Sequence, residues 1–151
     1  MKRNSFVVVL AGSLFILATA LMSQTKKPAA PTQAGVLKVV MDRGKQVYLE
    51  QCLACHQADA GGVQGMNPPL VKTKQVLGDK TALVKIVLNG MTGDLEVNGD
   101  TYHNVMAPHS DLTDLQISDV LTYVRNSFGN KAKAITPAEV KAIRAKNKPV
   151  Q

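Results

Sequence analysis

The sequence of 151 residues has no tryptophan and only three phenylalanines and three tyrosines. Aromatic side chains bury the largest areas in protein cores, so their scarcity predicts a thin hydrophobic core unless a bound group adds apolar surface. The chain also shows no internal repeat and no segment with convincing strand alternation. These absences favour an all-α fold, and the length suits one small domain with appendages.

The sequence contains only two cysteines, and they lie three positions apart. They are Cys52 and Cys55, and His56 follows directly, which completes the pattern C-x-x-C-H. On one helical turn, two thiols three residues apart share a face and can both add to the vinyl groups of a porphyrin, with the imidazole held under the iron. The pattern therefore predicts one covalently bound haem c, which would also supply the apolar surface that the core lacks.

Two other uses of a cysteine pair fit the sequence poorly. Thioredoxin-like C-x-x-C sites follow a strand in a βαβ setting, and no strand alternation precedes Cys52. A structural zinc site needs four ligands, whereas the remaining histidines, His103 and His109, lie far beyond Cys55 in the sequence and not at finger spacing from the cysteine pair. Haem attachment is therefore the favoured interpretation.

An apolar segment near the N-terminus indicates export. Lys2 and Arg3 precede an uncharged run over residues 6–22, which contains the small-x-small sequence of a cleavage site at residues 18–20. We interpret residues 1–23 as a signal peptide or as an N-terminal membrane anchor, because the run reaches the lower limit of a membrane-spanning helix. Cleavage is favoured, and either case places the remainder in the periplasm or at the outer face of the cytoplasmic membrane.

The exported part divides into three regions. We expect a flexible Pro/Ala/Lys linker over residues 24–36, a haem domain over 37–130, and a basic C-terminal extension over 131–151. The extension contains one short helix, begun by Thr136 and Pro137. Its apolar face is narrow, so we expect this helix to pack weakly on the outside.

Helical periodicity predicts three to five helices around the haem. The expected elements are a helix that runs into residue 52, a loop over 57–80, a helix over 80–88, a loop over 91–108 and a helix over 113–128. The last of these has the strongest signal, because Thr113 and Gln116 form a capping-box sequence ahead of a regular apolar stripe.

The side of the iron opposite His56 needs a ligand from a distant loop. The available side chains are Met41, Met66, Met91, Met106, His103 and His109. Met41 is too close in sequence to the attachment motif to reach the other side, and Met66 lies on the same side as His56. A position just before the C-terminal helix can be braced by that helix, which favours Met106, with Pro108 stiffening the loop. The two histidines or an open site are the alternatives, and Met91 is interpreted as filling a gap in the core.

Over about residues 37–129 the sequence resembles the class I mono-haem cytochrome c family, and especially the small bacterial cytochromes associated with periplasmic dehydrogenases. Besides C-x-x-C-H, the matching pieces are Asn67-Pro68-Pro69-Leu70, Leu88-Asn89-Gly90, Val97-Asn98-Gly99, Asn104-Val105-Met106 and residues 112–130. The resemblance implies that Met106 ligates the iron. It also implies that Pro68 or Pro69 accepts a hydrogen bond from the free nitrogen of His56.

The resemblance has one implication for helix packing, and the sequence departs from the family pattern at one position. The family's crossing of first and last helices would bring Gly44 and Tyr48 against Leu121 and Tyr123, with the glycine allowing a close approach. The departure is at the ligand, where the family usually has Met-Pro and this chain has Met-Ala-Pro from residue 106. We therefore expect a slightly softer ligand loop.

A thioether opposite an imidazole fills both axial positions and raises the haem potential. Such an iron cannot readily bind a substrate, so the sequence predicts a one-electron carrier and not an enzyme. The resemblance implies a quinoprotein or another periplasmic dehydrogenase as donor, and a terminal oxidase or another cytochrome as acceptor. The chain could also be a tethered subunit of such a complex. The alternative is an open distal site, which would make the protein a peroxidase, a reductase or a gas sensor.

The formal net charge is +7, and much of the excess lies in the two tails. No aromatic residues are interleaved with the basic ones and no nucleic-acid-binding motif is present, so we expect no nucleic-acid partner. The tail charges are interpreted as aiding solubility. The lysines nearer the haem segment are better candidates for steering toward an acidic redox partner; they are Lys72, Lys74, Lys80 and Lys85.

Overall fold

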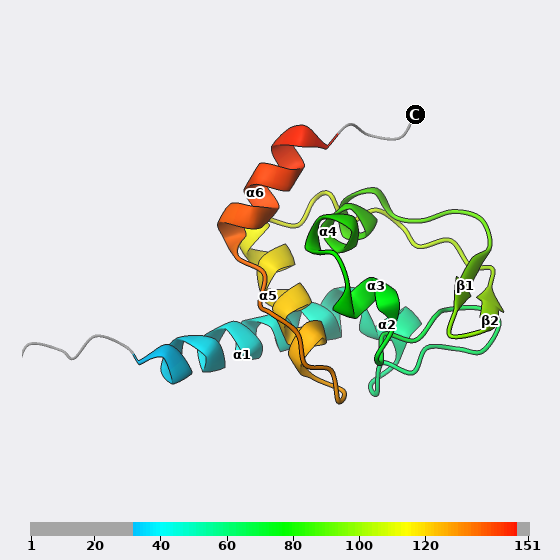
Figure 1. Cartoon of the computed structure of the whole chain (residues 1–151), viewed down its shortest axis with the longest axis horizontal. Helices are drawn as coiled ribbons and strands as arrows, with labels where there is room; N and C mark the ends of the chain where they lie inside the picture. Colours follow the sequence, from blue (N-terminus) through cyan, green and yellow to red (C-terminus); the bar gives the residue numbers. More distant parts are fainter. Residues whose placement is uncertain (1–31, 148–151) are drawn as a thin grey trace, which may run out of the picture. The chain divides into compact units, whose positions relative to one another are not determined.

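The computed structural model describes residues 32–147, in which six helices and one β-hairpin form (Figure 1). The elements are α1 (Gln33–Gln51), α2 (Leu53–His56), α3 (Lys74–Leu77), α4 (Lys80–Asn89), β1 (Leu95–Val97), β2 (Asp100–Tyr102), α5 (Asp114–Asn126) and α6 (Pro137–Lys146). The predicted, mainly helical class is confirmed, and α1 begins within the segment expected to be linker. The predicted signal peptide or anchor over 1–23 lies outside the described residues. Within them, no helix combines the length and apolar character that a membrane crossing requires.

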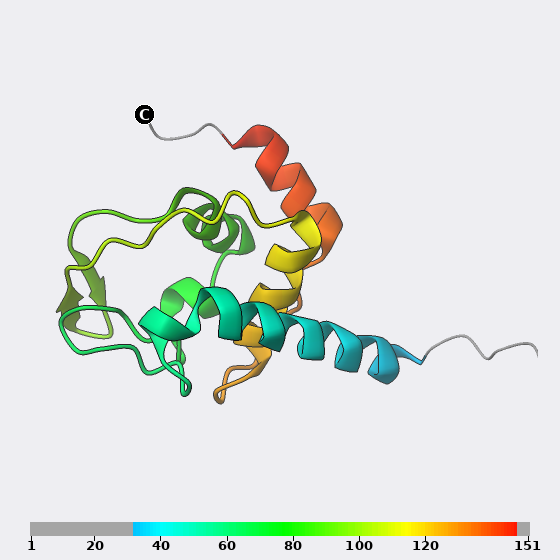
Figure 2. The same cartoon turned by 180° about the vertical axis from the view of Figure 1, so that it is seen from behind.

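Helices α1 and α5 cross at a point where only glycine fits. A Cβ atom on Gly44 would lie 2.1 Å from the backbone oxygen of Asp119 and 2.7 Å from the Cβ of Tyr123. Beside this contact the rings of Tyr48 and Tyr123 lie 5.7 Å apart between centroids. Helix α5 passes in front of α1 in Figure 1 and behind it in Figure 2. The crossing implied by the family resemblance is confirmed for these residues, whereas Leu121 lines the cavity described below.

Two short elements lie in segments that were expected to be loops. Strands β1 and β2 pair antiparallel, with Leu95 opposite Tyr102, and Asn98 and Gly99 form the turn at φ values of 54° and 93°. This is the two-residue Asn-Gly hairpin signal, so the expectation of no strand is wrong. Strands of three residues are too short for an alternation to be recognised. Helix α3 is one turn long, and the hydroxyl of Thr73 caps it by accepting a hydrogen bond from the Val76 N–H.

Helix α6 is firmly attached to α4 and α5, which corrects the expectation of weak packing. Val140 is completely buried in the main hydrophobic core. Arg144 donates to the Asp114 carboxylate at 2.7 Å and to the Ser110 carbonyl at 2.9 Å. The Lys80 ammonium lies 2.8 Å from a carboxylate oxygen of Glu139. The narrow apolar face is therefore supplemented by long-range polar contacts that a helical periodicity does not reveal.

Replacing Val140 by alanine is expected to lower the free energy of unfolding by about 1–3 kcal/mol, since two buried methyl groups leave a cavity between helices. Lys141→Ala is the matched control, because Lys141 is exposed on the same helix, and we expect its effect to stay within about 0.5 kcal/mol. Denaturant unfolding of both haem-loaded variants measures the difference. Equal stabilities would mean that α6 is not part of the cooperative fold.

The ion pair between Glu139 and Lys80 makes a pH-dependent contribution to stability. The hydrogen bond from Lys80, with further hydrogen bonds from Thr136, lowers the pKa of Glu139 from 4.5 to about 2. A carboxyl group whose pKa is lower in the folded state stabilises the fold above its unfolded pKa and loses this contribution as the pH falls through its folded pKa. The side chain is 40% exposed, so we expect less than about 1 kcal/mol.

The measurable consequence is a stability difference between wild type and Glu139→Gln that is present at pH 6 and shrinks between pH 4.5 and pH 2, the interval set by the two pKa values. Chemical denaturation at several pH values gives this difference directly. A difference that is constant over the same interval would show that the charge of Glu139 contributes nothing and that only the helix cap matters.

Candidate functional site

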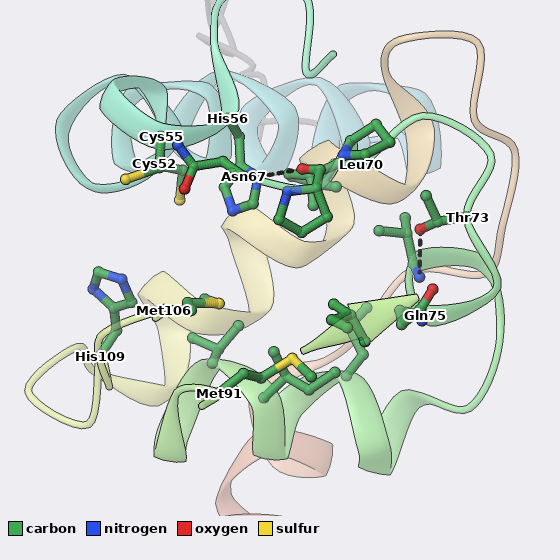
Figure 3. Close-up of a pocket in the computed structure, with 18 of the residues that line it drawn as sticks. Cys52, Cys55, His56, Asn67, Leu70, Thr73, Gln75, Met91, Met106 and His109 are labelled. Carbon is green, nitrogen blue, oxygen red and sulfur yellow. Dashed lines mark hydrogen bonds between the residues drawn. The ribbon is translucent and has the colours of Figure 1, made fainter. Parts of the chain in front are cut away.

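A cavity of about 270 Å³ lies between α4, α5 and the hairpin. Its walls are mainly apolar, with contributions from Leu83, Val87, Val97, Val120 and Val124 among others. Figure 3 shows the attachment motif at one side of this space and two methionines, Met91 and Met106, at the other. This apolar space at the centre of the domain suits a bound group, which the sparse aromatic content predicts.

The two cysteines lie on one turn at the junction of α1 and α2. The N–H groups of Cys55 and His56 both donate to the carbonyl of Cys52, at 3.2 and 2.9 Å. The turn is therefore helical, and the two thiols share the edge of the cavity. Cys55 is exposed, while burial, with a smaller effect of Cys55, raises the pKa of the Cys52 thiol to about 11. A free Cys52 is thus protonated and weakly nucleophilic at neutral pH.

His56 is held as a neutral imidazole. Its Nδ1 donates to the backbone carbonyl of Pro68 at 3.0 Å, so the proton is on Nδ1 and the lone pair on Nε2 is available to a metal. Burial lowers the pKa of His56, against the opposing effect of the Pro68 hydrogen bond and together with a smaller effect of His109. Of the two prolines named from the sequence, Pro68 supplies the carbonyl, and Pro69 lines the cavity.

The structure brings three of the six candidate distal ligands to the cavity, namely Met91, Met106 and His109. Met66 is 50% exposed, and His103 is exposed with its Nδ1 2.8 Å from the Asp94 carboxylate. Met41 lies on α1 and is not part of the cavity wall. Met91 was interpreted from the sequence as a gap filler, so its place in the cavity wall was not expected, whereas His109 was one of the alternative ligands.

The loop that carries Met106 is fastened to the end of α4. Met91 and Met106 exchange two backbone hydrogen bonds of 3.0 Å, and the His109 N–H donates to the Val87 carbonyl at 2.8 Å. Gly90, at φ +70°, allows this approach, because a Cβ there would lie 2.3 Å from the Met106 oxygen. These contacts hold the loop on both sides of Ala107, where the sequence predicted softness. The bridge between Met91 and Met106 joins one residue from each of two segments, so it produces no periodic pattern and could not be predicted from the sequence.

The donor set fits a haem and does not fit a bare metal ion. In residues 32–147 no three side chains of His, Cys, Asp or Glu come together in a way that could hold an ion. An imidazole with a free Nε2 and thioethers across the cavity are instead donors that could serve as axial ligands of a c-type haem, whose other four ligands would come from the porphyrin. The two thiols at the edge and the apolar walls match the remaining parts of that group.

Comparisons with known proteins match the chain to one family. The family model for cytochrome c matches residues 41–128. Cytochrome c-552 of Thermus thermophilus is 33% identical over 121 residues, which cover 74% of this chain and 81% of that protein. The cytochrome c subunit of alcohol dehydrogenase (quinone) from Gluconacetobacter polyoxogenes is 35% identical over 111 residues, 71% of this chain.

A third relative is the Cbb3-type cytochrome c oxidase subunit CcoP of Azospirillum sp., 38% identical over 97 residues, 59% of this chain. The matches cover only 23% of the dehydrogenase subunit and 29% of the oxidase subunit. This chain therefore corresponds to about a quarter of those larger proteins, and to most of the Thermus protein.

Proposed function

Because the chain belongs to the cytochrome c family and carries covalently bound haem c, we propose that it is a one-electron carrier with a His/Met-ligated haem. In this proposal Cys52 and Cys55 form the thioether links, and His56 and Met106 are the axial ligands. The observation that carries it is the placement of a neutral imidazole and a thioether at opposite sides of one apolar cavity, with both thiols at its edge.

The residues around the cavity favour electron transfer over catalysis. The haem supplies a centre that takes up and releases one electron. The Pro68 carbonyl orients His56 and increases its basicity as a ligand. The walls from α4 and α5 exclude water, and a thioether across from the imidazole raises the potential. With both axial positions filled by side chains, no position remains for a substrate.

The names of the relatives and the charge of the surface support a proposal for the redox partners. We propose a quinoprotein or other dehydrogenase outside the cytoplasm as electron donor, and a terminal oxidase or another cytochrome as acceptor. Lys80 is paired with Glu139, whereas three other lysines near the site are exposed and available to steer an acidic partner; they are Lys72, Lys74 and Lys85. The location would be the periplasm or the outer membrane face, with residues 1–23 as signal peptide or anchor.

The test is the absorption spectrum of the matured protein, oxidised and reduced, with and without carbon monoxide. We expect a c-type reduced spectrum, the weak red band of iron–thioether coordination in the oxidised state, and no prompt reaction with carbon monoxide. Immediate carbon monoxide binding by the wild type would mean an open iron. The carrier proposal would then be replaced by a peroxidase, reductase or gas sensor, to be examined with peroxide and nitric oxide.

A further inference from the structure

The pairing of Met91 with Met106 places two thioethers in one cavity. The residues form an isolated antiparallel bridge in which each N–H donates to the carbonyl of the other. In such a hydrogen-bonded pair the two Cα atoms are about 5.5 Å apart and the two side chains leave the ribbon on the same face. A methionine side chain has three rotatable bonds, so the two sulfurs can reach a common point.

The side chains of Met91 and Met106 both face the cavity. Met91 and Met106 are each half-buried and both line the space opposite His56 (Figure 3). They differ in their support, because Met106 packs against the main hydrophobic core and Met91 does not belong to that cluster. The thioether of Met91 therefore lines the space that the haem fits, outside the main hydrophobic cluster.

The third candidate, His109, lacks the backbone pairing that links Met91 to Met106. Its ring lies on the side of Met106 away from Met91 in Figure 3. Its backbone N–H is bound to the carbonyl of Val87, and it is not paired with Met106. Met91 is thus the side chain that the backbone brings next to the proposed ligand.

We propose that Met91 is a second thioether donor to the haem iron, which occupies the distal position whenever Met106 leaves it. The inference rests on the proposed assignment of Met106 as the resident ligand. One iron–sulfur bond breaks and another forms. Both donors are neutral thioethers, so the charge and the oxidation state of the iron are unchanged. The iron stays closed to small ligands even when the Met106 side chain has left it.

Four haem-loaded proteins test this proposal: wild type, Met91→Leu, Met106→Ala and the double variant Met106→Ala/Met91→Leu. Leucine keeps a side chain of similar volume at position 91 and replaces the thioether by a branched hydrocarbon, which cannot bind iron. The readouts are the weak red thioether band and the rate of carbon monoxide binding to the reduced protein. We expect wild type and Met91→Leu to keep the band. Met106→Ala should keep a thioether band and bind carbon monoxide at least ten-fold more slowly than the double variant, which should have lost the band.

The proposal is overturned if Met106→Ala loses the band and binds carbon monoxide as fast as the double variant. It is also overturned if Met91→Leu alone loses the band, because Met91 would then be the resident ligand. An open iron in the wild type is a different result, since it refutes the proposed carrier function itself. If the alanine variant yields no haem protein, the same comparison in a Met106→Leu background, with and without Met91→Leu, decides the question.

Discussion

Replacement of both Cys52 and Cys55 by serine is expected to abolish covalent haem attachment and, with it, the cooperative folding of the domain. The cavity between α4, α5 and the hairpin is lined by the same side chains that form the hydrophobic core, including Leu83, Val87 and Val124. Without the haem these side chains face a hollow. Tyr102 at the hairpin is the one tyrosine in the cavity lining, which contains no phenylalanine, and a single ring does not fill the space.

The size of the hollow sets the expected magnitude. An unfilled cavity of about 270 Å³ costs about 6 kcal/mol at the penalty found for core cavities, about 24 cal/mol per Å³. Entry of water at the exposed edge near Cys55 makes this an upper figure. The native state of a small domain is typically stable by only about 5–15 kcal/mol, so the loss is comparable with the whole stability.

The measurement is thermal unfolding followed by far-ultraviolet circular dichroism, together with a haem stain of the denatured protein. Cys55→Ser alone is the control, since it introduces one serine and leaves the thioether link through Cys52. We expect the single variant to retain haem and a cooperative transition. A haem-free double variant that melts cooperatively near the wild-type temperature would show that the fold does not depend on the cofactor.

Replacement of Gly44 by alanine is expected to destabilise the protein by about 3 kcal/mol or more, at or above the upper end of the usual cost of overpacking. The added Cβ would lie 2.1 Å from a backbone oxygen of α5, and a backbone atom cannot rotate away as a side chain can. Helix α1 must therefore move away from α5. That movement separates the Tyr48 ring from those of Tyr123 and Phe128, now 5.7 and 5.4 Å away.

The same displacement breaks an ion pair at the crossing. Arg43 donates to the Asp119 carboxylate at 2.6 Å, and the Asp119 side chain is only 4% exposed. A buried carboxylate that loses its partner is costly, which adds to the steric effect. The matched control is Gly35→Ala in the same helix, where the added Cβ would have one neighbour, the Thr32 hydroxyl, at 3.4 Å.

The two glycine variants are expected to shift stability in opposite directions. Gly35→Ala should stabilise by up to about 1 kcal/mol through helix propensity, whereas Gly44→Ala should lower the melting temperature by about 10 °C or more. Denaturant and thermal unfolding of the haem-loaded proteins measure both. If the two variants agree within 0.5 kcal/mol, a difference within ordinary surface effects, the close helix crossing is not a requirement of the fold.

The features that could be predicted from the sequence depend on residues close together in the chain. The C-x-x-C-H motif predicts the helical turn that now carries Cys52, Cys55 and His56. The capping boxes at Thr113 and Thr136 are both present, because a cap involves a residue and its neighbour three positions later. The haem cofactor follows from such local patterns together with the family resemblance.

The features that could not be predicted depend on contacts between distant segments. The bridge between Met91 and Met106 joins single residues and leaves no periodicity. The attachment of α6 depends on Arg144, whose long side chain reaches carbonyl groups more than 30 positions earlier, at Ser110 and Leu112. A sequence shows that such an arginine can donate several hydrogen bonds but not which acceptors the fold brings to it.

The position of α6 has a consequence for the order in which the domain assembles. This helix joins α4 to α5 from outside, through Val140 and through paired amides of Asn89 and Asn147 at 2.7 and 3.1 Å. Chains emerge N-terminus first, so the cysteine motif becomes accessible about 80 residues before α6 is available. The haem can therefore be attached while α4 and α5 are still free to separate, and the final helix then holds the two walls of the cavity together around it.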